Sequence, residues 1–149
     1  MTDKFRDIKI LIAEDDDDDF FILEEILSDL GLHEENIVRV HDGKELLDYL
    51  QSKAKFENET TITPSVIFLD LNMPVLSGKE ALRKMQNHKD LAQTLVVVHT
   101  TSSLQDDINY CYENGAKSYL VKEAGYEGYT QKMRTVLEYW SEVSELPSP

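Results

Sequence analysis

Apolar and polar positions along the chain follow a regular order of strand-like and helix-like segments. Short apolar runs rich in β-branched residues are typical of buried strands, and each run is followed by apolar residues at helical spacing. This alternation predicts an α/β domain, in which a parallel sheet is covered by helices on both faces. The predicted strands lie at residues 8–13, 37–40, 66–69, 95–98 and 118–121.

Glycines mark the ends of several predicted helices. Gly31 is positioned to end the first helix, and Gly115 the fourth. The polar segment 54–63 is predicted to be a surface loop, so we expect a single domain over residues 1–149 with its core at about 7–144. The last helix carries an apolar stripe that is typical of core packing. The stripe consists of Tyr129, Met133, Val136, Leu137, Trp140 and Val143.

The order of the strands in the sheet follows from short, right-handed crossovers. They favour a flavodoxin-like, doubly wound (βα)5 sheet with strand order 2-1-3-4-5, in which strands one and three are neighbours. Ligands bind such sheets at the carboxyl ends of the strands where the order reverses. Glu14 and Asp15 directly follow the first strand, and Asp70 follows the third. The topology therefore predicts that three carboxylates meet in one crevice.

Carboxylates held close together repel one another and need a cation or protons to coexist. Mg²⁺ (or Mn²⁺) suits such a site, because a few carboxylates bind it while water and phosphate complete its shell. Thr100 follows the fourth strand with a hydroxyl, Lys122 follows the fifth with an ammonium, and Asn72 offers a backbone carbonyl. Together these groups are suited to phosphoryl transfer to Asp70, which depends on positioning and charge neutralisation.

The segments that carry these residues also resemble a known family. They are Ile-Leu-Ile-Ala-Glu-Asp-Asp at 10–16, Val-Ile-Phe-Leu-Asp-Leu-Asn-Met-Pro-Val-Leu-Ser-Gly at 66–78, Val-Val-Val-His-Thr-Thr-Ser at 96–102 and Gly-Ala-Lys-Ser-Tyr-Leu-Val-Lys at 115–122. On these motifs the chain resembles a response-regulator receiver domain of the CheY-like superfamily over about residues 8–144. The resemblance implies a two-component phosphorelay protein in which Asp70 accepts a phosphoryl group from a sensor histidine kinase.

The same resemblance implies a role for each residue of the site. It implies a signalling protein that promotes its own magnesium-dependent phosphorylation and dephosphorylation, not an enzyme with a separate substrate. The implied metal ligands are Glu14, Asp15, Asp70 and the backbone carbonyl of Asn72. The implied phosphoryl contacts are Thr100 and Lys122, with Tyr119 as the switch aromatic and Thr101 and Ser102 as modulating residues.

A narrower resemblance is to the single-domain regulators that partner bacterial and cyanobacterial phytochromes. It rests on the turn at 100–102, on Lys122 followed by Glu123 rather than proline, and on the tail at 140–147. It implies a phytochrome-type histidine kinase as the partner. Many receivers have proline after the lysine, often with a cis peptide bond, so here the Lys122–Glu123 peptide is expected to be trans. Thr101 is larger than the usual alanine and is expected to restrict access to Asp70.

Composition limits the partners of the chain. Its 149 residues include 29 acidic and 15 basic side chains, which give a net charge of −14. Such a chain repels a nucleic-acid backbone but is compatible with metal cations and basic protein surfaces. The single cysteine, Cys111, cannot form an internal disulfide, and no apolar run is long enough to span a membrane. We therefore expect a cytoplasmic protein that binds neither nucleic acid nor membrane.

Few residues follow the last predicted helix, so no output domain is expected. Output would then run through contacts with a downstream protein, at the face made by the fourth helix, the fifth strand and the fifth helix. A homodimer through that face and a helix packed only on its own sheet are both compatible with the long, apolar last helix.

Other interpretations of the acidic residues fit less well. The run at 15–19 is not a calcium loop, because Phe20 stands where glycine is needed and Ile26 where glutamate is needed. A haloacid-dehalogenase-like phosphatase would need a second acid at the position of Asn72. A flavodoxin-like flavin binder would need a Ser/Thr/Gly-rich loop where this chain has five aspartates. The histidines show no ligand spacing, and His99 is expected to be packed or hydrogen-bonded.

Overall fold

The computed structural model describes residue 5 and residues 7–143, so positions 144–147 of the predicted core and tail lie outside it. Within this part of the chain, five parallel strands form one sheet in the order β2-β1-β3-β4-β5. The predicted doubly wound, flavodoxin-like order is confirmed. The strands are β1 (Ile10–Ala13), β2 (Ile37–Val40), β3 (Val66–Leu69), β4 (Val96–Thr100) and β5 (Ser118–Val121).

A helix follows each strand, as the apolar spacing predicted. Side chains at the N-termini of the first three helices accept hydrogen bonds from backbone N–H groups of the first turn, which stabilises the helix start. These capping residues are Asp16, Asp42 and Ser77. The helices are α1 (Asp17–Asp29), α2 (Gly43–Leu50), α3 (Gly78–Gln86), α4 (Gln105–Glu113) and α5 (Tyr126–Glu138), and a π-helical turn at Tyr139–Val143 follows α5.

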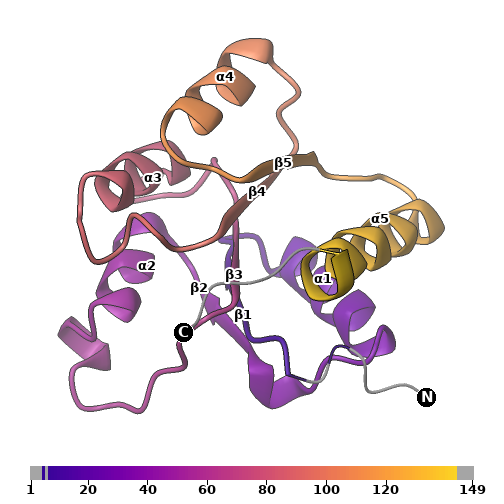
Figure 1. The fold of residues 1–149 in the computed structure, drawn as a ribbon, viewed down its shortest axis with the longest axis horizontal. Helices are drawn as coiled ribbons and strands as arrows, with labels where there is room; N and C mark the ends of the chain where they lie inside the picture. Colours follow the sequence, from indigo (N-terminus) through magenta and orange to yellow (C-terminus); the bar gives the residue numbers. More distant parts are fainter. Residues whose placement is uncertain (1–4, 6, 144–149) are drawn as a thin grey trace.

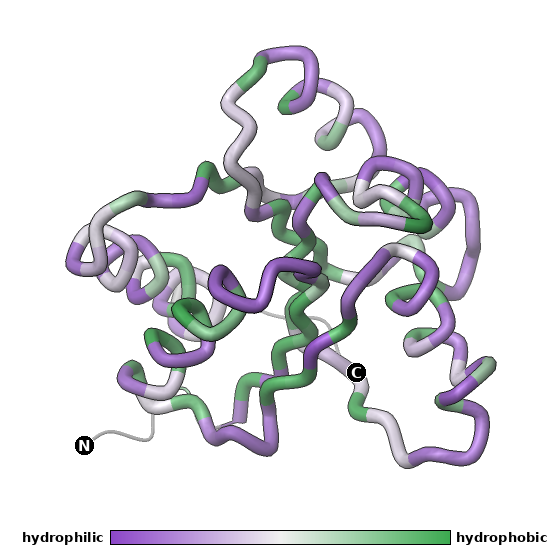
Figure 2. The backbone as a smooth tube through the Cα atoms, turned by 180° about the vertical axis from the view of Figure 1, so that it is seen from behind, coloured by the Kyte–Doolittle hydropathy of each residue, from purple (hydrophilic) through white to green (hydrophobic). Residues whose placement is uncertain are grey.

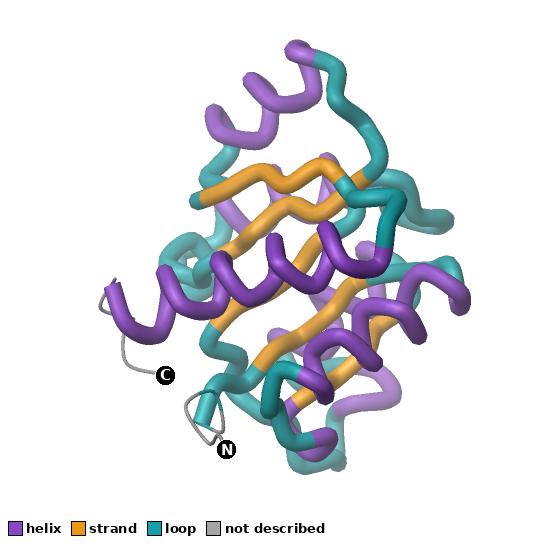
Figure 3. The backbone as a smooth tube through the Cα atoms, turned by 90° about the vertical axis from the view of Figure 1, so that its right-hand side faces the viewer, coloured by secondary structure: helices purple, strands orange, loops and turns teal. Residues whose placement is uncertain are grey.

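The helices form two layers around the sheet. α1 and α5 lie side by side on one face, while α2, α3 and α4 cover the other (Figures 1 and 3). Successive strand residues point to opposite faces, so the apolar core falls into two clusters. The strands form a continuous hydrophobic centre, and the hydrophilic positions lie mostly on the surrounding helices and loops (Figure 2).

Two strands differ from their predicted bounds. β1 begins at Ile10 rather than residue 8, because the Ile8 N–H donates to the Phe5 carbonyl in a turn before the ladder begins. β4 continues to Thr100, because the Lys122 N–H donates to the Thr100 carbonyl over 2.8 Å. Apolar pattern alone does not locate such ends, because they depend on which backbone groups the neighbouring strand offers.

Other local predictions are confirmed. The described backbone contains no cis peptide bond, so the Lys122–Glu123 peptide is trans. Cys111 is a buried, unpaired thiol on α4. Along the α5 stripe, Tyr129, Met133 and Leu137 are buried. Among the described residues, no helix has both the length and the apolar character needed to cross a membrane.

Gly78 fixes the loop that follows β3. Its N–H donates to the Leu71 carbonyl over 3.0 Å, and a Cβ at this position would lie 2.1 Å from the Asp70 carbonyl oxygen. The opposing atoms belong to the backbone and cannot rotate away. Only glycine therefore lets α3 begin this close to Asp70.

We expect Gly78→Ala to lower the free energy of unfolding by about 1–3 kcal/mol, because the added methyl forces the Asp70 loop to shift. Urea unfolding would measure the change. Gly128→Ala is the control, since Gly128 is exposed on α5 and its added Cβ would lie 3.7 Å from the Glu123 side chain. The control should be neutral or stabilising by up to about 1 kcal/mol. Equal effects in the two variants would contradict the close-packing argument.

Candidate functional site

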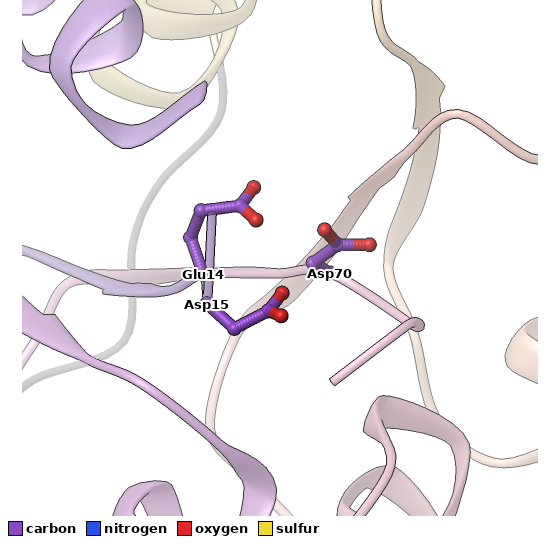
Figure 4. A group of neighbouring side chains, drawn as sticks. All are labelled: Glu14, Asp15 and Asp70. Carbon is purple, nitrogen blue, oxygen red and sulfur yellow. The ribbon is translucent and has the colours of Figure 1, made fainter. Parts of the chain in front are cut away.

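Three carboxylates meet at the carboxyl ends of β1 and β3. The pairing of Ala13 with Leu69 brings the next residues of both strands side by side, and the Asp70 N–H donates to the Ala13 carbonyl over 3.1 Å. One carboxylate oxygen from each of Glu14, Asp15 and Asp70 lies within 4.8 Å of the others (Figure 4). The predicted convergence is therefore present in the structure.

The three acids differ in exposure. Glu14 and Asp70 are buried, with 5% and 6% of their surfaces exposed, whereas Asp15 is exposed. The Asn72 N–H donates to Oδ1 of Asp70 over 3.2 Å and so orients that carboxylate. The site thus combines two buried acids, Glu14 and Asp70, with a third, Asp15, that faces solvent.

Lys122 supplies the positive charge at the centre of this cluster. Its Nζ donates to Oε1 of Glu14 over 2.7 Å, to Oδ2 of Asp19 over 2.8 Å and to Oδ2 of Asp70 over 3.1 Å. The Lys122 side chain is only 9% exposed. An ammonium has three protons, so these three carboxylates use its full donor capacity.

The pKa values of Glu14 and Lys122 are both raised, for different reasons. Burial raises the pKa of Glu14 to about 7; the Lys122 hydrogen bond opposes this shift, and the charge of Asp70 adds to it. Burial alone would lower the pKa of Lys122, but hydrogen bonds to Asp19 and Glu14 and the charge of Asp70 raise it overall. Lys122 therefore remains protonated at neutral pH.

The cluster fits a divalent cation by its donor chemistry. Glu14, Asp15 and Asp70 each provide an oxygen, the donor type that Mg²⁺ and Mn²⁺ prefer over nitrogen or sulfur. Burial of Glu14 beside Asp70 makes its ionisation unfavourable, and a cation would remove that penalty. The predicted role of the Asn72 carbonyl as a further ligand stays a prediction.

Thr100 brings a hydroxyl to the end of β4. The residue is fully buried, and its Oγ1 has no hydrogen-bond partner among the described residues. Buried hydroxyls in native proteins are usually hydrogen-bonded, and an exception needs an explanation such as a ligand contact. The arrangement is compatible with the predicted phosphoryl contact.

The remaining predicted residues lie on different sides of the loop after β4. Thr101 is exposed and lines, with Lys122, a cavity of about 400 Å³. Ser102 does not line that cavity, and its Oγ donates to Asp107 on α4. The Tyr119 hydroxyl donates to the Ser102 carbonyl over 2.9 Å. Tyr119 therefore contacts the loop that follows Thr100, as a switch residue would, while inward rotation of its ring stays a prediction.

Sequence reasoning missed the contact of Asp19 with Lys122. Asp17, Asp18 and Asp19 share the first turn of α1, where negative charge complements the helix dipole. That explanation is sufficient for all three residues, so pattern alone did not single out Asp19. A signal was nevertheless present, because side chains in a first helical turn lean toward the N-terminus and hence toward the end of β1.

Arg39 on β2 is a second residue that the sequence did not reveal. Its Nε donates to the Glu14 carbonyl over 3.0 Å, and its guanidinium pairs with Asp17 over 2.8 Å and lies over the Phe20 ring. These contacts link the edge strand to the segment between β1 and α1. Arg39 thus supports the backbone that carries Glu14.

His99 is packed in the core, as expected. It lies between the rings of Phe68 and Tyr129 and is 3% exposed. Burial lowers its pKa to about 3, and the charge of Lys122 contributes in the same direction. His99 is therefore neutral at physiological pH.

Comparison with known proteins agrees with this geometry. Residues 10–134 match the model of the response regulator receiver domain. The chain belongs to the response regulator receiver family. This receiver is 32% identical over 139 residues to response regulator Rcp1 of Synechocystis sp. (strain ATCC 27184 / PCC 6803 / Kazusa), an alignment that covers 93% of this chain and 92% of Rcp1.

Solved structures of two relatives are also similar to the receiver. The phosphorylated cyanobacterial phytochrome response regulator RcpA is 30% identical, with a TM-score of 0.82. The Mn²⁺-bound form of Rcp1 is 29% identical, with a TM-score of 0.83. Each match covers 95% of this chain and 99% of the other. The predicted two-component signalling class is confirmed, and the phosphatase and flavin-binding interpretations are not favoured.

We expect acid to destabilise the receiver less when His99 is replaced. The pKa of His99 is lower in the folded chain than in the unfolded one, where it is about 6.5, so the unfolded state binds more protons as pH falls. His99 therefore lowers stability progressively from about pH 6.5 toward pH 3. Relative to His99→Leu, the wild type should lose up to about 1.4 kcal/mol more per pH unit in this range.

Urea unfolding between pH 7 and pH 4 would measure this difference in slope. His33→Gln, at an exposed position, is the matched control. A His99→Leu profile that parallels the control would show that the buried imidazole does not resist protonation.

Proposed function

We propose that the receiver accepts a phosphoryl group on Asp70 from a sensor histidine kinase and signals through a phosphorylation-dependent protein-interaction face. One observation carries the proposal: the buried Asp70 carboxylate lies with an acid pair and accepts a hydrogen bond from the Lys122 ammonium. The neighbouring strand β4 ends at Thr100, whose buried hydroxyl has no partner among the described residues. Such a set is suited to placing a nucleophile and neutralising a phosphoryl group.

In the proposed transfer, a carboxylate oxygen of Asp70 attacks the phosphorus of a phosphohistidine. A P–O bond forms as the P–N bond breaks, and the histidine nitrogen leaves with the electron pair and then takes up a proton. The Asn72 N–H holds Oδ1 of Asp70, and Lys122 lies against Oδ2. Lys122 and Thr100 then donate hydrogen bonds to the phosphoryl oxygens.

Glu14, Asp15 and Asp70, with the backbone carbonyl of Asn72, would hold Mg²⁺ or Mn²⁺. When bound, the ion neutralises charge on the carboxylates and on the phosphoryl oxygens. The oxygen donor set supports this assignment, as does the similarity to Rcp1, whose structure is known with Mn²⁺ bound. Autophosphorylation from small donors and self-catalysed dephosphorylation belong to the same proposal.

We further propose that Thr100 and Tyr119 couple Asp70 to the face formed by α4, β5 and α5. The Tyr119 hydroxyl bond to the loop after β4 supports this route, because movement of Thr100 would alter that loop. Leu104 and Tyr112 near and on α4 are large apolar residues that are 67% and 50% exposed. They offer a downstream protein, or a second copy of the chain, an apolar surface.

We also propose a phytochrome-type histidine kinase as the partner. The support is the similarity over nearly full length to Rcp1 and to RcpA, which is a phytochrome response regulator.

Incubation with acetyl phosphate and Mg²⁺ should add one phosphoryl group to the wild type, measured by intact mass. Asp70→Asn should take up none, because the amide is not a nucleophile. Asp106→Asn removes an exposed carboxylate on α4 and should label like the wild type. Normal labelling of Asp70→Asn would refute the assignment of the acceptor.

Mg²⁺ should raise the melting temperature of the wild type, because a ligand that binds only the folded state stabilises it. Asp15→Asn should weaken Mg²⁺ binding by about 10-fold or more, since it removes a charged ligand. Calorimetric titration would measure the affinity, with Asp106→Asn as the control. Asp15 is exposed, so the variant is expected to fold. Unchanged affinity would place the ion elsewhere.

A further inference from the structure

The three acceptors of Lys122 are not equally able to release it. The side chains of Glu14 and Asp70 are 6% and 8% exposed, whereas that of Asp19 is 42% exposed. A buried carboxylate that loses its partner remains unsolvated, which costs several kcal/mol. An exposed one gains water in exchange. Asp19 is therefore the acceptor that Lys122 can leave at the lowest cost.

A phosphoryl group on Asp70 would accept a hydrogen bond from Lys122, whose protons are already used in the resting receiver. Lys122 has three protons, and Glu14, Asp19 and Asp70 accept all of them. The Asp70 carboxylate loses its charge when it becomes an acyl phosphate, so its bond to Lys122 weakens. The phosphoryl group then competes for the ammonium with the two remaining carboxylates, Glu14 and Asp19. Of these two, Glu14 is buried and Asp19 is partly exposed, so Asp19 is the carboxylate that Lys122 leaves at the lower cost.

We propose that Asp19 is a positioning residue that competes with the phosphoryl group for Lys122 and thereby weakens the phosphorylated state. This inference rests on the proposed phosphorylation of Asp70. Asp19 holds the ammonium between α1 and β5 in the resting receiver and releases it when the phosphoryl group arrives.

The surroundings of Asp19 fit this role. Its backbone is fixed, because its N–H donates to the capping carboxylate of Asp16 over 2.9 Å and the next residue, Phe20, is buried. Its side chain lines the same cavity of about 400 Å³ as Lys122 and Thr101. The cavity gives water access to the carboxylate once Lys122 has moved.

A purely structural role at the helix start would apply equally to Asp18. Both residues lie in the first turn of α1 and carry the same charge, but Asp18 is exposed. Among the described residues, the Lys122 ammonium donates to Glu14, Asp19 and Asp70 and not to Asp18. Asp18→Asn is therefore matched to Asp19→Asn in charge, size and helix position. A difference between them isolates the contact with Lys122.

The test uses beryllofluoride, a non-covalent analogue of a phosphoryl group, at saturating Mg²⁺. Calorimetric titration of the full chain should show that Asp19→Asn binds the analogue roughly 2- to 5-fold more tightly than the wild type, the range expected for removing a partly exposed ion pair. Asp18→Asn should bind like the wild type. Asp19→Glu, which restores the carboxylate, should return the affinity toward the wild-type value.

The ¹⁵N resonance of the Lys122 ammonium provides an independent readout. It should shift when the wild type binds the analogue, and should already be displaced in free Asp19→Asn but not in free Asp18→Asn. Equal affinities for the two asparagine variants, or weaker binding by Asp19→Asn, would overturn the competition. If instead the wild type fails to bind the analogue, or Asp70→Asn binds it equally well, the proposed phosphorylation itself is wrong.

Discussion

The placement of one ammonium among several carboxylates is the constraint on which the site depends. Without Lys122, the buried acids Glu14 and Asp70 would lie side by side with no compensating charge, which is strongly unfavourable in a low-dielectric interior. Lys122 comes from the end of β5, two strands away from β3, so the sheet must be complete before the acids are neutralised. The same contact therefore belongs both to the fold and to the site.

Much of this arrangement was predictable because it depends on local pattern and topology. Apolar runs located the strands, crossover handedness gave their order, and the residues after each strand gave Glu14, Asp15, Asp70 and Lys122. Asp19 was different. Its contact depends on how α1 packs against the end of β5, about a hundred residues later, and its charge already had a sufficient local explanation. The predicted start of β1 and the predicted end of β4 each differ from the structure by two residues. These ends depend on which backbone groups the neighbouring strand offers for hydrogen bonds.

The loop after β4 connects the site with the opposite helical layer. The Ser102 carbonyl accepts from Tyr119, and its hydroxyl donates to Asp107, which in turn pairs with Lys79 on α3. These contacts begin two residues after Thr100 and link the loop to β5, α4 and α3. The proposed coupling of Asp70 to the α4–β5–α5 face would therefore have a physical path made of discrete contacts, as expected of a two-state element rather than of gradual deformation.

The unpartnered hydroxyl of Thr100 has a consequence for the receiver at rest. It has no hydrogen-bond partner among the described residues, and a buried hydroxyl left in that state costs about 1–3 kcal/mol, which narrows the free-energy gap to any arrangement that satisfies it. A narrower gap means that unmodified molecules visit such an arrangement more often. In the proposed switch, a single oxygen at the end of β4 would thus help to set how often the receiver is active without a phosphoryl group.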